Sequence, residues 1–128
     1  MTLFRHLAAL VLATLASAAL AAGIKPFDAS EFDRLAEAGK PIVVAVQAPW
    51  CPTCKAQKPI QQALMADPRF KDYTLFTVDF DNDKPLLAKF KATMQSTMIV
   101  YRGRTEEGRS VGDTTRAGIE ALMLKAAG

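Results

Sequence analysis

The stretch PIVVAVQAPWCPTC at residues 41–54 decides the fold, because a short apolar run leads directly into two closely spaced cysteines. Residues 41–46 are uncharged and rich in β-branched side chains, which is typical of a central strand covered on both faces. From Pro52 to Ala66 apolar residues recur at helical spacing, and the pair Asp67-Pro68 ends the pattern. The sequence therefore predicts that the cysteines lie at the junction of a buried strand and a helix.

Helical and extended patterns alternate along the rest of the chain. The predicted elements are helix 29–38, strand 41–46, helix 52–66, strand 74–80, helix 85–91, strand 97–101, strand 105–111 and a last helix after residues 113–115. Strands separated by helices imply parallel pairing with right-handed crossovers, and the closing hairpin adds an antiparallel strand. We therefore expect an α/β domain with a central mixed β-sheet flanked by helices on both faces.

The beginning of the chain has the layout of a secretory signal. A basic start is followed by an uncharged apolar stretch over residues 7–20 and an Ala-x-Ala site. That stretch is shorter than the roughly 20 residues that a membrane-spanning helix needs. We expect a signal peptide at residues 1–21, cleaved after Ala21 or else after Ala22, and one domain over residues 22–128 that is exported to the periplasm. An uncleaved signal that anchors the protein is the alternative.

The composition of the mature chain excludes several kinds of site. Its only histidine, His6, lies in the signal, so histidine-assisted catalysis and zinc sites with histidine ligands are excluded. Two cysteines also fall short of a four-ligand zinc site, and we predict neither a metal nor a cofactor. Loss of Arg5 with the signal lowers the net charge from +3 to +2, which predicts no nucleic-acid partner.

The spacing of the two cysteines suits redox chemistry. Residues three apart at a helix start have Cβ atoms about 5–6 Å apart, which suits a disulfide with little strain. At the helix N-terminus the thiolate of Cys51 is favoured, so Cys51 is the predicted nucleophile, and Cys54 would then attack the resulting mixed disulfide. Pro52 would stiffen the turn, and Trp50 would shield one side of the pair. We expect Cys51 to be more solvent-accessible and more acidic than Cys54.

The segment from Ala48 to Lys55, with Pro59 five residues after the second cysteine, resembles the thioredoxin active site and its kinked helix. The similarity to the thioredoxin-like family extends over most of residues 25–126. It implies the thioredoxin fold and an enzyme, a thiol–disulfide oxidoreductase acting on protein substrates. The string at residues 50–54 also resembles the thioredoxin-like reductants of cytochrome c maturation, although their insertion is absent. This resemblance implies a reductase supplied with electrons by a membrane protein. We expect the protein to act as a monomer in the periplasm.

Three positions depart from the family pattern. Ala45 stands where the family has a buried acidic residue that assists deprotonation of the inner cysteine. Ser96 stands where the family has a cis-proline, and a non-proline cis bond costs about 2.5–4 kcal/mol, so we expect a trans peptide. The dipeptide at residues 52–53 replaces Gly-Pro, so the reduction potential need not match that of thioredoxin.

The resemblance also suggests which residues contact a substrate. Ser96 and Thr97 are expected to face Cys51 and to offer backbone and hydroxyl groups to an extended peptide. The candidate substrate-binding residues are Trp50, Pro52, Thr53, Ser96 and Thr97, beside the catalytic pair Cys51 and Cys54. Two other functions remain open at this point. The cysteines of two chains could share a metal or an iron–sulfur cluster, or the domain could be a redox-inactive module that binds peptides.

Overall fold

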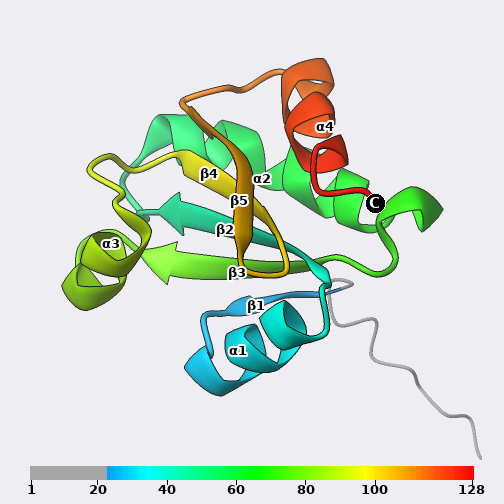
Figure 1. Cartoon of the computed structure of the whole chain (residues 1–128). Coiled ribbons are helices and arrows are strands. Elements are labelled where there is room, and N and C mark those ends of the chain that lie inside the picture. Colours follow the sequence, from blue (N-terminus) through cyan, green and yellow to red (C-terminus); the bar gives the residue numbers. More distant parts are fainter. Residues whose placement is uncertain (1–22) are drawn as a thin grey trace, which may run out of the picture.

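The computed structural model describes residues 23–128, so the predicted signal peptide lies outside the described residues (Figure 1). The elements are β1 (Ile24–Pro26), α1 (Ala29–Glu37), β2 (Pro41–Gln47), α2 (Pro52–Met65), the short 3₁₀ helix η1 (Pro68–Phe70), β3 (Thr74–Asp79), α3 (Lys84–Phe90), β4 (Thr97–Arg102), β5 (Thr105–Val111) and α4 (Arg116–Leu124). Each predicted helix and strand is present, with ends that agree to within one residue.

The five strands form one sheet in the order β1-β3-β2-β4-β5. Strand β2 pairs in parallel with β3 and antiparallel with β4, β1 pairs in parallel with β3, and β5 closes the other edge antiparallel to β4. The predicted mixed sheet is therefore confirmed. Strand β1 is absent from the predicted elements, because its three residues are too few to show an alternating pattern.

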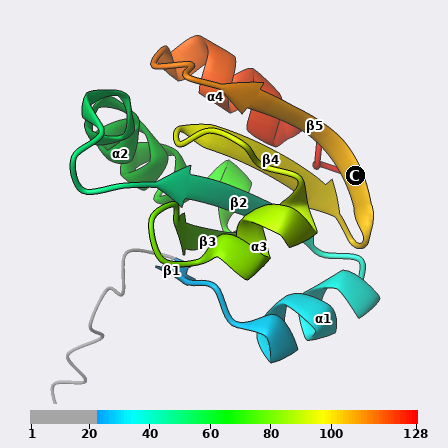
Figure 2. The same ribbon diagram turned by 90° about the vertical axis from the view of Figure 1, so that its left-hand side faces the viewer.

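Helices cover both faces of the sheet, as predicted (Figure 2). The core beneath α2 and α4 includes Val43, Ala45, Leu64, Met65, Leu75, Met98, Val100, Ile119, Leu122 and Met123. The core beneath α1 and α3 includes Phe32, Leu35, Ile42, Val44, Val46, Phe76, Val78, Leu87, Phe90 and Ile99. Residues 42–46 alternate between these two cores, and Pro41 is buried at the start of the strand, so every residue from 41 to 46 is buried. This double coverage explains why β2 carries no charge.

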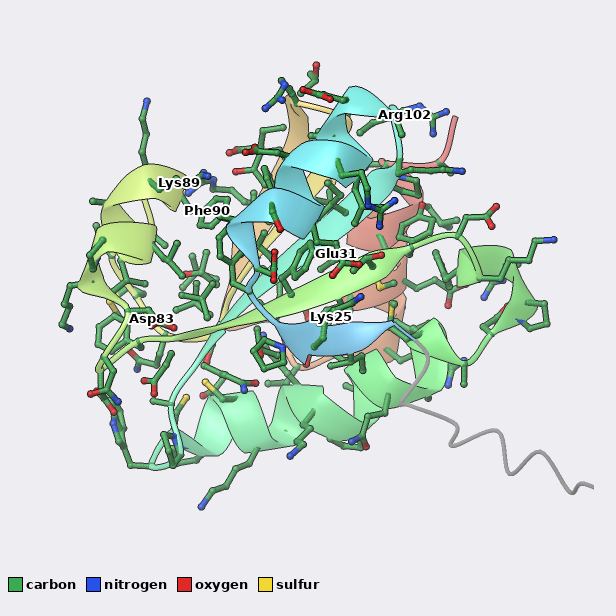
Figure 3. The ribbon with its side chains drawn as sticks, turned by 90° about the horizontal axis from the view of Figure 1, so that it is seen from below. Lys25, Glu31, Asp83, Lys89, Phe90 and Arg102 are labelled. Carbon is green, nitrogen blue, oxygen red and sulfur yellow. The ribbon has the colours of Figure 1, made fainter. Side chains whose placement is uncertain are left out.

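Aromatic rings hold α1 and α3 against the sheet. The ring of Phe32 packs edge-on against Phe90, with ring centroids 5.6 Å apart. The ammonium group of Lys89 lies 5.2 Å from the centroid of Phe32 and 5.8 Å from that of Phe90, which adds a cation–π contact. Figure 3 shows Lys89 and Phe90 on α3, beside α1. Within residues 23–128 no helix combines the length and the apolar character needed to cross a bilayer.

The fold brings two chain segments together at one end of the sheet. The chain leaves β2 at Gln47 and enters α2 at Pro52. Since β4 runs antiparallel to β2, with Met98 opposite Ala45, the segment that precedes β4 lies at this same end. The backbone N–H of Ser96 donates to the carbonyl of Val46 over 2.9 Å. The cysteines and the Ser96 segment are therefore neighbours, although 42 residues of sequence separate Cys54 from Ser96.

Candidate active site

Cys51 is the N-cap residue of α2, and both cysteines are free thiols. The Cys51 backbone is extended, with φ −85° and ψ 111°, so its side chain turns back over the helix start. The backbone N–H of Cys54 donates to the Cys51 sulfur over 3.1 Å. Pro52 occupies the first turn, where its missing N–H breaks no helical hydrogen bond. The predicted junction of a buried strand and a helix is confirmed.

The expected order of accessibility is wrong. Cys51 is 1% exposed and Cys54 is 8% exposed, so both are buried and Cys51 is the less accessible. Cys51 packs with Ala48 and Phe80, and the Ser96 side chain lies against it. A helix start is open to solvent only if no other segment covers it. Here the segment before β4 covers it.

The two thiols differ in acidity in the expected direction. Burial opposes ionisation of Cys51 and is the largest single influence on it. Hydrogen bonds from the Cys54 side chain, the Ser96 hydroxyl and two backbone N–H groups together outweigh burial and lower the pKa of the Cys51 thiol. Burial first, and then the hydrogen bond to Cys51, raise the pKa of the Cys54 thiol. The pair therefore favours a thiolate on Cys51 and a proton on Cys54.

Ser96 touches both sulfurs. Its hydroxyl oxygen lies 3.2 Å from the Cys51 sulfur and 3.1 Å from the Cys54 sulfur, and the residue is 3% exposed. Its peptide bonds are trans, as expected. Its φ of +62° lies in the left-handed region, which residues other than glycine rarely adopt. The expectation that Ser96 faces Cys51 is confirmed.

Internal hydrogen bonds already use the Ser96 backbone. Its N–H donates to Val46, and its carbonyl accepts from the backbone N–H of Gly112 and from the side-chain amide of Gln57. The expectation that this backbone pairs with a substrate is therefore wrong, because the left-handed turn directs both groups into the protein. Thr97 is also buried, and its hydroxyl donates to the Met94 carbonyl over 2.7 Å. No hydrogen bond joins Thr97 to Cys51 within residues 23–128.

Three large apolar side chains are exposed on the segments around the buried pair. Trp50 is 55% exposed, its ring NH donates to Asp81 over 2.8 Å, and its ring meets Phe80 edge-on. Met94 and Val111 are 49% and 57% exposed. Both flank the segment before β4: Met94 accepts the Thr97 hydrogen bond and Val111 pairs with Thr97 in the sheet. Pro52 is exposed and Thr53 half-buried beside Cys51. The sequence patterns did not single out Met94 or Val111 for this surface.

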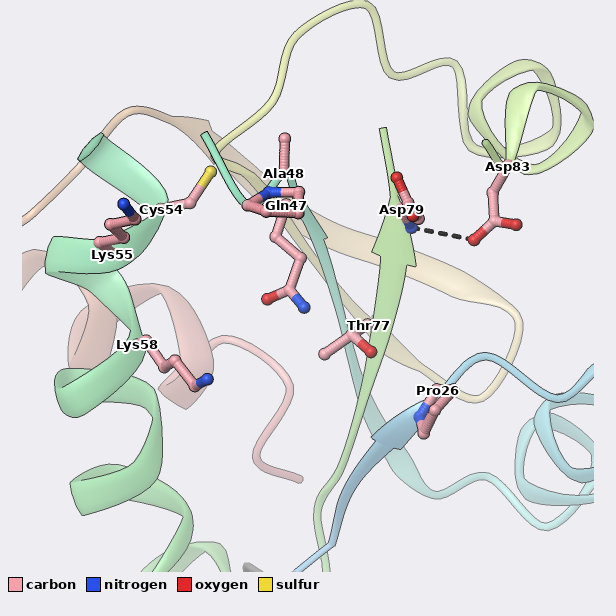
Figure 4. Close-up of a pocket in the computed structure, with 10 residues that line it drawn as sticks. Pro26, Gln47, Ala48, Cys54, Lys55, Lys58, Thr77, Asp79 and Asp83 are labelled. Carbon is pink, nitrogen blue, oxygen red and sulfur yellow. Dashed lines mark hydrogen bonds between the residues drawn. The ribbon is translucent and has the colours of Figure 1, made fainter. Parts of the chain in front are cut away.

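A cavity of about 490 Å³ opens beside Cys54 (Figure 4). Lys55 and Lys58 of α2 line one side, and Thr77, Asp79 and Asp83 line the other. Neither carboxylate is directed at a cysteine. Asp83 accepts from the backbone N–H of Asp79 over 2.9 Å, and Asp79 accepts from residues 81 and 82. In the part of the chain that the structure describes, no group of three or more acidic, histidine or cysteine side chains could hold a metal ion.

Comparison with known proteins extends these findings. Residues 23–125 match the family model described as Thioredoxin. The chain is 27% identical over 96 residues to "Thioredoxin Asp f 29" of Aspergillus fumigatus, which covers 74% of this chain and 84% of that protein. It is 28% identical over 98 residues to "Thioredoxin" of Mycobacterium tuberculosis, with 77% and 84% coverage. A bifunctional thioredoxin reductase/thioredoxin of Mycobacterium leprae also matches, and there the chain spans 21% of the relative's length.

Solved structures share the architecture. The crystal structure of Trxlp from Edwardsiella tarda superposes with a TM-score of 0.74 at 36% identity, covering 77% of this chain and 97% of that chain. The thioredoxin NaTrxh from Nicotiana alata superposes with a TM-score of 0.71 at 24% identity, covering 82% and 93%. The five-stranded mixed sheet with four α-helices is therefore the arrangement found in thioredoxin-fold structures.

Proposed function

The chain belongs to the thioredoxin family and is a thiol–disulfide oxidoreductase, and on this premise we propose that it reduces disulfides of protein substrates in the periplasm through Cys51 and Cys54. One observation carries the proposal. Cys51 caps the start of α2, where the backbone N–H of Cys54 donates to its sulfur and its thiol pKa is lowered. A thiolate is thus available next to a second thiol one turn away, which is what disulfide exchange requires.

The reaction proceeds in two exchanges. The Cys51 thiolate attacks one sulfur of the substrate disulfide, so that a Cys51–substrate disulfide forms and the other substrate sulfur leaves as a thiolate. Cys54 then loses its proton and attacks the Cys51 sulfur, which releases the second substrate thiolate. The substrate gains two electrons, and the protein is left with a Cys51–Cys54 disulfide. Because the pKa of Cys54 is raised, its deprotonation is the step that needs assistance.

An extended apolar segment fits the surface around the pair. Trp50, Met94 and Val111 are large apolar side chains that remain exposed on the segments beside Cys51 and Ser96. Burying such side chains against a partner contributes about 25 cal/mol per Å² of apolar surface. Pro52 and Thr53 border the nucleophile on the same rim. Substrate binding therefore relies on side-chain contacts here, since the Ser96 backbone is already paired.

Export and electron supply complete the proposal. Support for export comes from the basic, apolar and Ala-x-Ala pattern of residues 1–21, and the family match begins at residue 23, just after this segment. A reductase must be reduced again after every turnover. Because the bacterial periplasm is kept oxidising, the electrons must be delivered across the membrane, so a membrane thiol protein is the proposed donor. The protein would act as a monomer without nucleic acid.

Two experiments test the proposal. With dithiothreitol as electron donor, the mature domain should accelerate insulin reduction, and Cys51→Ser should abolish the acceleration. Equal activity of the wild type and Cys51→Ser would refute the role of Cys51. The full chain, expressed in a Gram-negative host, should be recovered from the periplasmic fraction with its N-terminus at Ala22 or Gly23. Recovery of uncleaved protein from the cytoplasm would refute export.

A further inference from the structure

A single hydroxyl group connects the two sulfurs of the active site. The Ser96 oxygen lies 3.2 Å from the Cys51 sulfur and 3.1 Å from the Cys54 sulfur, and it is shielded from solvent. A hydroxyl has one proton to donate and two lone pairs that accept. We propose that Ser96 is a catalytic residue that stabilises the reduced, singly ionised cysteine pair by donating to the Cys51 thiolate while accepting from the Cys54 thiol. This inference rests on the proposed role of the two cysteines.

The surroundings of the two sulfurs set the direction of these hydrogen bonds. The Cys51 sulfur already accepts from the Cys54 backbone N–H at the start of α2, so it is where a negative charge is best stabilised. The backbone N–H of Ala48 donates to the Cys54 sulfur, but burial and the hydrogen bond to Cys51 outweigh it, so the pKa of Cys54 is raised and Cys54 keeps its proton. With a thiolate on Cys51 and a thiol on Cys54, the Ser96 hydroxyl is proposed to donate its proton to Cys51, which leaves its oxygen available to accept from Cys54. The single Cys54 proton can be directed at the Cys51 sulfur or at the Ser96 oxygen, and in the second arrangement the contacts run from the Cys54 thiol through the Ser96 hydroxyl to the Cys51 thiolate.

Oxidation removes both contacts. When the pair passes two electrons to a substrate disulfide, Cys54 loses its proton, Cys51 loses its charge and a bond forms between the two sulfurs. Neither sulfur of a disulfide has a proton to donate or a negative charge to attract one. The Ser96 hydroxyl thus interacts strongly with the reduced pair and weakly with the oxidised pair. It shifts the equilibrium towards the dithiol and raises the reduction potential.

The segment that carries Ser96 is built to hold the hydroxyl in place. A left-handed backbone is unfavourable for a residue with a Cβ, and here three hydrogen bonds hold it. One comes from Gln57, a 2% exposed side chain on the same helix as the cysteines. Its amide donates to the carbonyls of Ser96, over 3.2 Å, and Asp113, over 2.9 Å. Gln57 is therefore a positioning residue that fixes Ser96 relative to α2.

The charged groups around the cysteine pair stay the same when Ser96 or Ser110 is substituted. They are Lys55 and Lys58 of α2, Asp79 at the end of β3, Asp83 before α3, Asp81 beside Trp50 and Asp113 after β5. Hydrogen bonds from the Asn82 side chain and from the Asp81 backbone lower the pKa of Asp79, and those from Thr115 lower that of Asp113. A difference between the wild type and a Ser96 variant at the same pH therefore isolates the hydroxyl.

The test compares Ser96→Ala with Ser110→Ala in the mature domain. Ser110 on β5 also has a buried hydroxyl, and it makes no hydrogen bond within residues 23–128. For each protein the thiolate absorbance is titrated with pH, and the dithiol–disulfide equilibrium is measured in glutathione buffers at several pH values. A hydrogen bond to a charged group favours the charged form over the neutral form by a factor of about ten or more. Ser96→Ala should therefore raise the pKa of Cys51 by about one unit, and Ser110→Ala should leave it unchanged.

The pH dependence separates this role from a structural one. Where Cys51 is ionised, Ser96→Ala should shift the equilibrium about tenfold towards the disulfide, which is about 30 mV. Below the pKa of Cys51 both thiols are protonated, and the shift should shrink towards zero. A shift of equal size at every pH, or none at all, would overturn the proposal. Ser96→Gly, which relieves the left-handed backbone, should reproduce the result, and wild-type values for it would also overturn the proposal. None of these readouts depends on export or on insulin reduction.

Discussion

The Ala45→Asp substitution should supply a base that Cys54 lacks. Ala45 is 2% exposed on β2, and its partner in the parallel ladder is Thr77. Side chains of paired residues, and of residues two apart on a strand, project from the same face of a sheet. Thr77 and Gln47 both line the cavity that contains Cys54. A carboxyl group at position 45 would therefore point towards that cavity and could accept the proton that Cys54 loses during resolution.

The cost of the substitution follows from the burial of Ala45. A buried polar group without full hydrogen bonding costs about 1–3 kcal/mol, and for a domain of this size each kcal/mol lowers the melting temperature by about 4–8 °C. Desolvation would raise the pKa of the new carboxyl above its unfolded value of about 3.9. The folded state then holds the proton more tightly than the unfolded state. The charge-related loss of stability is therefore complete above the folded pKa and disappears below about pH 4.

The assay separates catalysis from destabilisation. A mixed disulfide on Cys51 is formed by rapid mixing with a thiosulfonate reagent, and its decay through attack by Cys54 is followed after acid quenching by mass spectrometry. Ala45→Asp should accelerate this decay near neutral pH, whereas Ala45→Asn, which buries a similar side chain without a base, should not. Urea melts of both variants give the stability. If Ala45→Asp is destabilised but decays at the wild-type rate at every pH, another group already serves Cys54 and the reasoning is refuted.

Three other outcomes are expected. Cys54→Ala should accumulate substrate adducts on non-reducing gels, because loss of Cys54 blocks release of the mixed disulfide, whereas Cys51→Ala should accumulate few. Equal adduct yields from the two variants would contradict the assigned order of attack. Iodoacetamide at mildly acidic pH should modify Cys51 before Cys54, as peptide mapping would show, because the lowered pKa of Cys51 outweighs its lower exposure. Gln57→Leu should lower the unfolding free energy by about 1–3 kcal/mol in urea melts, since it removes the donor to two carbonyls, and an unchanged midpoint would show that the amide is dispensable.

Local chemistry made much of the fold predictable. Strand β2 was predictable because residues 41–46 carry no charge, which is typical of a strand buried between two apolar layers. The cysteine pair was predictable because its position after this strand and before a helix limits what two thiols can do. Strand β1 could not be predicted, since three residues at the sheet edge are held by pairing with β3 rather than by their own pattern.

Long-range packing decided the features that sequence reasoning missed. The burial of Cys51 depends on Ser96, which lies 45 residues further along the chain. Gln57 carries a polar side chain that by itself favours an exposed position, yet it is buried because its amide donates to the carbonyls of Ser96 and Asp113. Met94 lies between the predicted helix 85–91 and the predicted strand 97–101, where no periodic pattern assigns it to core or surface, and the structure exposes it. Such contacts link residues whose spacing in the sequence carries no periodic signal.

The reduction potential of the Cys51–Cys54 couple tests the central claim most directly. The mature protein is equilibrated with glutathione buffers of known ratio, and the thiol and disulfide forms are separated after acid quenching. A reductase of protein disulfides should have a reduction potential more negative than about −200 mV. This limit lies between the potentials of thioredoxin, about −270 mV, and of protein disulfide isomerase, about −180 mV. A potential near −120 mV, typical of a strong disulfide donor, would contradict the proposed direction of electron flow.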